Sequence, residues 1–83
     1  MENLKNLDYK EILEMAKERV RDVPSGISFK VRDLFVGYQW DQIKVGDRKK
    51  IGLYFFVWVD STASELLDVL DKSPSGQQMY RRK

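Results

Sequence analysis

The sequence predicts a small α+β domain, in which helices come first and a β-hairpin closes the chain. Near the start, Asp8 and Glu11 form a capping pattern ahead of residues that are apolar at helical spacing. Near the end, a Pro-Ser-Gly turn signal at residues 74–76 lies between two segments that have the length of strands. Because 83 residues have room for one modest core, we expect residues 1–83 to form a single domain.

The first helix is predicted to begin at Tyr9, directly after the capping residue Asp8. One apolar stripe gives this helix an inward face: Ile12, Leu13, Ala16 and Val20. A Pro-Ser-Gly sequence at residues 24–26 ends the helix, because proline cannot continue it and glycine favours a turn.

Three short segments are expected after this turn. Ile27–Phe29 alternates in the manner of an edge strand, and Lys30–Phe35 has the pattern of a brief amphipathic helix. Tyr38–Ile43 is expected to form one helical turn, with Trp40 and Ile43 on the core. These segments lead into the most apolar part of the chain.

The stretch from Asp47 to Val59 joins a basic cluster to a run without charge or proline. Its β-branched and aromatic residues favour a strand. The same stretch also fits a helix, with Asp47 as N-cap and with Ile51, Phe55 and Val59 spaced by four residues. As a helix it is apolar nearly all round, so we expect a partner chain or a ligand to bury its outer face. These residues alone leave both interpretations open.

The last part of the chain is predicted to contain a hairpin. Residues 60–64 indicate a loop, and Glu65–Asp71 fits either a helix or a strand. Since the turn signal follows, we expect residues 66–71 to pair with residues 77–82.

The order of these elements is that of a winged helix-turn-helix domain. The sequence also resembles a family of small proteins from firmicutes and their mobile elements, long catalogued without a function. Within it, the sequence is similar to small proteins encoded by staphylococcal cassette chromosome elements, and this similarity implies single-stranded DNA binding through a winged helix-turn-helix fold. The resemblance covers Ser25 to the C-terminus and depends on Phe29–Phe35, Trp40–Ile43, Gly46–Arg48, Ile51, Gly52, Phe55, Val59 and Gln77–Arg81.

The resemblance implies three helices with a C-terminal β-hairpin wing, and it makes Asp47–Val59 the helix in the recognition position. Gly52 would then mark a close helix approach. The implied core consists of Phe29, Leu34, Trp40, Ile51, Phe55 and Val59. The implied function is single-stranded DNA binding that supports replication or transfer of a mobile genetic element.

Positive charge is concentrated in two segments of the chain. Residues 44–50 contain Lys44, Arg48, Lys49 and Lys50 with one acid, and residues 72–83 contain Lys72, Arg81, Arg82 and Lys83 with none. In a winged helix the two sets lie on one side, so we expect a groove that follows a phosphate backbone. The alternative is a solvated basic face with a disordered tail.

Aromatic side chains in the predicted third helix favour unpaired bases over a duplex. After Lys50, this helix contains none of the Arg, Asn and Gln side chains that read base edges in a duplex. Tyrosine rings, in contrast, stack on the bases of single strands. Phe55, Phe56 and Trp58 are expected in the core or in a dimer interface. The candidate nucleic-acid-binding residues are Arg48, Lys49, Lys50, Tyr54, Lys72, Tyr80, Arg81 and Arg82.

Composition argues against an enzyme. The chain has no His and no Cys, which removes the commonest general base and both disulfides and thiolate zinc sites. Ser61, Thr62 and Ser64 beside Asp60 are expected to cap helices. We therefore expect no catalytic residues, no metal and no cofactor. The chain shows no signal-peptide pattern and no apolar run near the roughly 20 residues that cross a bilayer, so we expect a cytoplasmic protein without membrane contact.

Three hypotheses follow from the sequence. The first is a binder of single-stranded DNA with little sequence preference, which self-associates through the apolar face of its third helix. The second is a protein-interaction module that docks on a replication partner such as a helicase or polymerase. The third is a duplex-binding transcriptional regulator.

Overall fold

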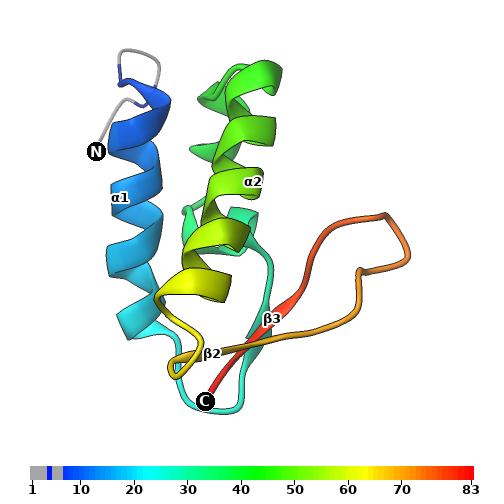
Figure 1. The fold of residues 1–83 in the computed structure, drawn as a ribbon. Coiled ribbons are helices and arrows are strands. Elements are labelled where there is room, and N and C mark those ends of the chain that lie inside the picture. Colours follow the sequence, from blue (N-terminus) through cyan, green and yellow to red (C-terminus); the bar gives the residue numbers. More distant parts are fainter. Residues whose placement is uncertain (1–3, 5–6) are drawn as a thin grey trace.

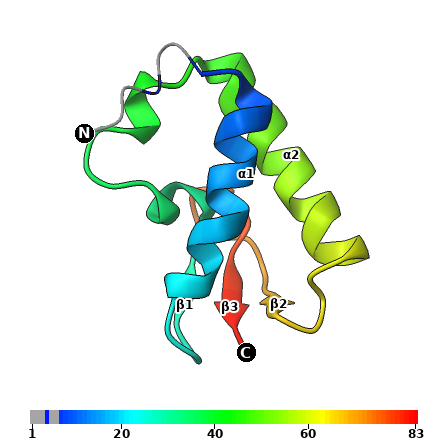
Figure 2. The same cartoon turned by 90° about the vertical axis from the view of Figure 1, so that its left-hand side faces the viewer.

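The computed structural model describes Leu4 and residues 7–83, and in this part the chain forms two α-helices and a three-stranded antiparallel sheet. Helix α1 (Tyr9–Arg19) and helix α2 (Val45–Ser61) lie side by side and run in the same direction (Figures 1 and 2). Both helices pack against the sheet with their apolar faces, so the core lies between the helix layer and the sheet.

The last strand of the chain is the middle strand of the sheet (Figure 2). Strand β3 (Tyr80–Arg82) pairs on one side with β1 (Ser28–Phe29) and on the other with β2 (Leu67–Val69). The register places Tyr80 opposite Phe29, and both side chains face the helices and are buried. Strand β1 is an edge strand, as predicted from its alternating pattern.

Helix α1 begins where its capping residue predicts. The Asp8 carboxylate accepts a hydrogen bond from the Lys10 backbone N–H at 3.0 Å, which satisfies one of the amides that a helix start leaves free. The predicted stripe Ile12, Leu13, Ala16 and Val20 is buried. The helix ends in a 3-10 turn (Val20–Asp22) just before the predicted Pro-Ser-Gly stop.

Residues 47–59 are helical, which settles the choice between helix and strand. Ile51, Phe55 and Val59 are fully buried along one side of α2. The prediction that Asp47 caps this helix is wrong, because α2 already begins at Val45 and Asp47 lies in its first turn. An acidic residue there still interacts favourably with the positive end of the helix dipole.

The implied role of Gly52 is also wrong. A Cβ atom added to this glycine meets no atom within 4 Å, so no neighbouring helix approaches it closely.

The prediction of a winged helix-turn-helix with three helices and a C-terminal hairpin wing is wrong. Residues 30–35 form only a 3-10 turn (Val31–Leu34), and residues 38–43 form another (Trp40–Gln42), so the described part of the chain has no α-helix between α1 and α2. The first turn is closed by Asp33, whose carboxylate accepts the Lys30 backbone N–H at 2.9 Å. This bond satisfies the N–H of the N-cap residue Lys30 and so fixes the start of the turn.

The two segments of the predicted hairpin do pair with each other, but they do not form a separate wing. Residues 67–69 pair with residues 80–82, and β3 is the middle strand of the sheet, with Tyr80 buried in the core. The long connection 70–79 leaves the sheet and extends away from α1 (Figure 1). Its Pro-Ser-Gly turn is present, since the Gly76 N–H donates to the Ser73 carbonyl at 2.8 Å and Gly76 has a φ of 84°.

Arg19 ties α1 to the irregular segment that precedes α2. Its guanidinium donates to the Leu34 carbonyl at 3.0 Å and to the Gln39 side-chain oxygen at 3.1 Å, and it lies over the Phe35 ring. The same Gln39 oxygen accepts the Val36 backbone N–H at 3.0 Å. Because Gln39 is buried, these bonds replace water that the folded chain excludes.

We expect Gln39→Ala to lower the free energy of unfolding by about 1–3 kcal/mol, because it leaves a buried N–H and part of a guanidinium without an acceptor. Urea unfolding followed by circular dichroism measures this change. Glu18→Ala, on the exposed side of α1, is the matched control and should stay within about 0.5 kcal/mol. An equal effect of the two substitutions would show that the Arg19–Gln39 contact contributes no net stability.

Candidate functional site

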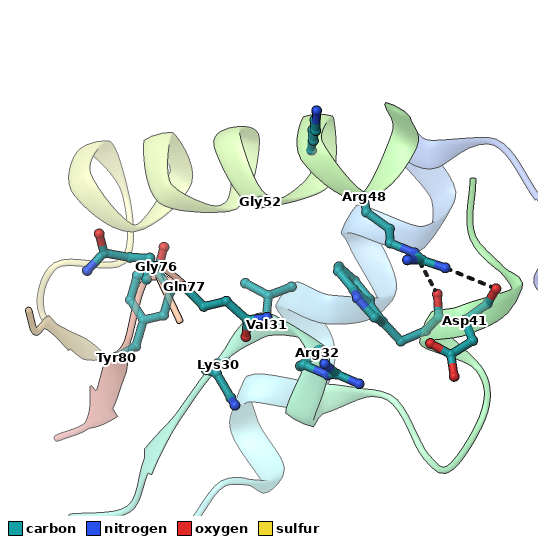
Figure 3. A pocket seen from close by; sticks show the side chains of 12 residues that line it. Lys30, Val31, Arg32, Asp41, Arg48, Gly52, Gly76, Gln77 and Tyr80 are labelled. Atoms are coloured by element: carbon teal, nitrogen blue, oxygen red, sulfur yellow. Dashed lines mark hydrogen bonds between the residues drawn. The ribbon is translucent and has the colours of Figure 1, made fainter. Parts of the chain in front are cut away.

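A cavity of about 460 Å³ lies between the irregular segment, the first half of α2 and the β2–β3 connection (Figure 3). Its volume is within the range of about 300–1,000 Å³ that is usual for ligand pockets. Three parts of the chain that are distant in sequence meet there. The lining residues are Lys30, Val31, Arg32, Trp40, Asp41, Arg48, Lys49, Gly52, Gly76, Gln77, Gln78 and Tyr80.

The lining of the cavity is basic. Lys30, Arg32, Arg48 and Lys49 contribute positive charge, and Asp41 is the one acidic residue among the lining residues. Lys49 and Arg32 are exposed and Lys30 is half-buried, so their charged ends reach solvent at the rim. None of the ion pairs found in the described part of the chain involves these residues. A rim of unpaired cations favours an anionic ligand.

Arg48 positions the cavity wall as well as adding charge. Its Nε donates to the Trp40 carbonyl at 3.2 Å, and one terminal nitrogen donates to the Asp41 carbonyl at 3.1 Å (Figure 3). A guanidinium presents several donors in a fixed plane and suits two neighbouring carbonyls. Arg48 therefore fixes the 3-10 turn that holds Trp40 at the cavity.

The opposite wall is an ordered turn. The Ser73 hydroxyl accepts the Gln77 backbone N–H at 3.2 Å, and the Ser73 N–H donates to the Gln77 carbonyl at 2.7 Å. The Gln78 side chain donates to the Leu70 carbonyl across the connection. These bonds hold the backbone of the β2–β3 connection, so it presents the half-buried Gln77 to the cavity in a defined position.

Trp40 is the aromatic side chain that the cavity offers to a ligand. It is half-buried, and one side of it packs on Phe35 with the ring centroids 5.5 Å apart. Tyr80 also belongs to the cavity wall, but its side chain is fully buried. A planar ligand can therefore reach the indole and not the phenol.

The structure separates the predicted cations of α2. Lys49 and Arg48 line the cavity, whereas Lys50 faces α1, where its ammonium lies 5.0 Å from the centre of the Tyr9 ring. Tyr54 also faces α1 and stacks on Tyr9, with ring centroids 6.0 Å apart and an interplanar angle of 17°. One face of the Tyr54 ring is thus occupied, although the side chain remains partly exposed.

The predicted cations of the C-terminal segment lie outside the cavity. Arg81 pairs with Asp68 across the sheet at 3.2 Å, and the Arg82 guanidinium donates to the Lys83 carbonyl at 3.1 Å. Both lie on β3, whose C-terminal end points away from the β2–β3 connection (Figure 1). Lys72 is exposed within that connection. Their contact with nucleic acid stays a prediction.

Tyr80 does not fit the stacking role that the sequence suggested. Its ring is fully buried, with centroids 5.1 Å from Phe55 and 5.9 Å from Phe29. Its hydroxyl is buried without a hydrogen-bond partner, and burial raises the pKa of the phenol from 10.0 to about 12. Tyr80 is a core residue.

Sequence reasoning missed Lys30 and Arg32. They lie in a segment that was predicted to be an amphipathic helix, so they counted as ordinary solvated residues. The available signal was Asp33, which follows Arg32 directly and lies three residues after Lys30. Its carboxylate accepts the Lys30 backbone N–H, and it forms no ion pair with either cation. Gln77 and Trp40 were noticed in the sequence but not associated with each other.

The fold and the cavity define a small helix-and-sheet protein with a basic, aromatic-lined site. The chain belongs to the family described as "Domain of unknown function (DUF1413)", which matches residues 14–82. This match confirms, at the level of the family, the resemblance seen in the sequence.

A solved structure described as "SCCmec type IV LP1413 - nucleic acids binding protein" shares the fold. The TM-score is 0.69 at 14% sequence identity, and the match covers 89% of this chain and 91% of that chain. At this identity the likeness establishes the fold. No curated protein matches the chain. Among the residues that the structure describes, no helix is long and apolar enough to cross a membrane.

Removing the Tyr80 hydroxyl should change how stability depends on pH. The unfolded phenol loses its proton near pH 10, whereas the folded one keeps it until about 12, so the free energy of unfolding falls as the pH rises through this window. In Tyr80→Phe this part of the decrease should disappear. Urea unfolding between pH 9 and 12 tests this, with Tyr54→Phe as the control for losing an exposed phenol. Identical pH profiles for wild type and Tyr80→Phe would contradict the burial of the hydroxyl.

Gly52→Ala should raise the free energy of unfolding by about 0.5–1 kcal/mol, because alanine favours the helix and its Cβ meets nothing within 4 Å. Gly76→Ala is the matched control, and its positive φ should make it destabilising by about 1 kcal/mol. Thermal unfolding of the two variants measures both effects. If Gly52→Ala instead lowers the free energy of unfolding, another part of the chain lies close to Gly52, as the resemblance implied.

Proposed function

We propose that this protein binds single-stranded DNA with little sequence preference, and that the basic cavity is where the strand is held. The cavity's composition carries the proposal. Lys30, Arg32 and Lys49 supply cations for phosphates, Trp40 supplies a surface for stacking a base, and Gln77 supplies an amide for base edges. In this arrangement the backbone of a flexible single strand lies along the cationic rim, and one base enters the cavity.

The structural neighbour supports a nucleic-acid ligand. A solved structure with this fold is described as "SCCmec type IV LP1413 - nucleic acids binding protein". We extend that description to this chain because the cavity has the charge that a phosphate backbone requires. On this proposal the protein acts by binding rather than by catalysis, and it serves the replication or transfer of a mobile genetic element.

Single strands fit the site better than duplex DNA. Reading a duplex requires a helix whose exposed side chains reach base edges in the major groove. The exposed side of α2 instead carries Leu53, Phe56 and Val57, which form no hydrogen bonds to bases. Because the described part of the chain also lacks a helix-turn-helix, the duplex-binding regulator has no structural support.

A fluorescence titration with oligo-dT and a matched duplex tests the proposal. We expect oligo-dT to quench tryptophan emission and to bind more tightly than the duplex, with log K falling by about 0.7 per phosphate contact for each unit of log salt. Trp40→Phe should remove most of the quenching. Trp58→Phe should retain it, because Trp58 packs on Phe55 outside the cavity. Preference for the duplex, or quenching that depends on Trp58 alone, would contradict the proposal.

Charge variants locate the strand in the same titration. Lys30→Ala and Lys49→Ala should each weaken oligo-dT binding severalfold and reduce the salt slope by about 0.7. Lys10→Ala, an exposed lysine outside the cavity, is the matched control and should change neither quantity. If Arg81→Ala and Arg82→Ala abolish binding while the cavity variants do not, the C-terminal cations predicted from the sequence form the site.

A further inference from the structure

The outer side of α2 is an apolar surface that nothing in the described part of the chain covers. Leu53 is 60% exposed, Val57 is 50% exposed and Phe56 is 37% exposed. These residues are neighbours on the helix, since positions three and four apart lie on the same face. A contiguous group of large apolar side chains on a helix of a small protein marks an interaction surface.

The charges at the two ends of this surface have opposite signs. Lys49, Leu53, Phe56 and Asp60 follow one another at spacings of four, three and four residues, so they form one line along α2. Counted from the C-terminal end of the helix, the same four residues again have spacings of four, three and four. An antiparallel copy of α2 therefore places Lys49 opposite the partner's Asp60 and Leu53 opposite the partner's Phe56. A parallel copy would instead place like charges together.

These charges are not explained by the stability of α2 itself. The positive end of a helix dipole is at the N-terminus, where lysines are unfavourable, and the negative end is at the C-terminus, where aspartate is unfavourable. Lys49 lies in the first half of α2 and Asp60 lies in its last turn. Both are exposed, and Asp60 takes part in none of the ion pairs found in the residues that the structure describes. A contact with a second chain gives both charges a partner.

We propose that two copies of this protein associate through α2, antiparallel and about a two-fold axis that passes midway between Leu53 and Phe56. The contact is isologous, so each chain contributes the same surface. Val57 lies beside the line and widens the apolar part of the interface. One helix from each chain buries less than the roughly 1,200 Å² of a standard stable interface. The dimer is therefore weak and depends on concentration.

This inference does not depend on the proposed function. Lys49 also lines the cavity, so its substitution affects both properties, and self-association is measured without nucleic acid. The outcomes then remain separate. Dimerisation without oligo-dT binding refutes the proposed function alone, and oligo-dT binding by a protein that stays monomeric at millimolar concentration refutes the dimer alone.

Sedimentation equilibrium from micromolar to millimolar protein tests the dimer. We expect a monomer–dimer equilibrium that Leu53→Gln weakens about tenfold or more, equivalent to about 1.4 kcal/mol. Circular dichroism verifies that the variant is folded, which is expected because Leu53 is exposed. A wild-type protein that stays monomeric at millimolar concentration, or a dimer unaffected by Leu53→Gln, would overturn the proposal.

Charge reversal tests the antiparallel arrangement. Lys49→Glu and Asp60→Lys should each weaken the dimer, because each places like charges across the interface. The two substitutions together should restore it. Each reversal also moves the charge of α2 towards the arrangement that a helix dipole favours, so loss of the dimer cannot be attributed to a weaker helix. A double variant that dimerises no better than the single variants would exclude this pairing of α2 helices.

Discussion

The structure depends on the aromatic contact between α2 and the middle strand of the sheet. The Tyr80 ring meets Phe55 edge-on at 5.1 Å and meets Phe29 at 5.9 Å, and all three side chains are buried. Aromatic rings in such pairs contribute about 0.5–1.5 kcal/mol beyond the area that they bury. Because Tyr80 begins β3, this contact also fixes where the β2–β3 connection returns to the sheet. The same cluster therefore holds the core and sets one wall of the cavity.

The segment between β1 and α2 is fixed by arginines rather than by regular hydrogen bonding. Buried carbonyl groups need donors, and a segment with only short 3-10 turns leaves several of them unpaired. Arg19 donates to the Leu34 carbonyl from α1, and Arg48 donates to the carbonyls of Trp40 and Asp41 from α2. The two helices thereby hold this segment from both ends. As a result, hydrogen bonds from both helices position the segment that carries Trp40.

Charge on this protein is divided between paired and unpaired groups. At the C-terminal end of the sheet, Arg81 and Lys83 both approach Asp68, at 3.2 and 3.6 Å. Around the cavity, Lys30, Arg32 and Lys49 are without an ion-pair partner among the described residues. Unpaired cations at the rim of a cavity attract anionic ligands. The outer face of α2, with Leu53, Phe56 and Val57, is an exposed apolar surface. Lys49 lies between this surface and the cavity.

The sequence by itself determined the features that depend on near neighbours. The Asp8 cap, the apolar stripe of α1 and the turn at residues 73–76 each follow from residues within a few positions of one another, and the structure contains all of them. The apolar exposed face of α2 also followed from helical spacing. These signals are local, so no knowledge of the rest of the chain was required.

Only the tertiary structure decided the features that join distant residues. Residues 51–59 fitted both a helix and a strand in the sequence, and in the fold they form a helix whose Phe55 packs on Tyr80, 25 positions away. The helix predicted at residues 30–35 is a 3-10 turn, and the Leu34 carbonyl at its end accepts a hydrogen bond from the distant Arg19. The cavity brings Lys30 and Gln77 together, and no pattern in either segment indicates that they meet. Such contacts are selected by the burial and hydrogen bonding of the whole fold, which local spacing does not encode.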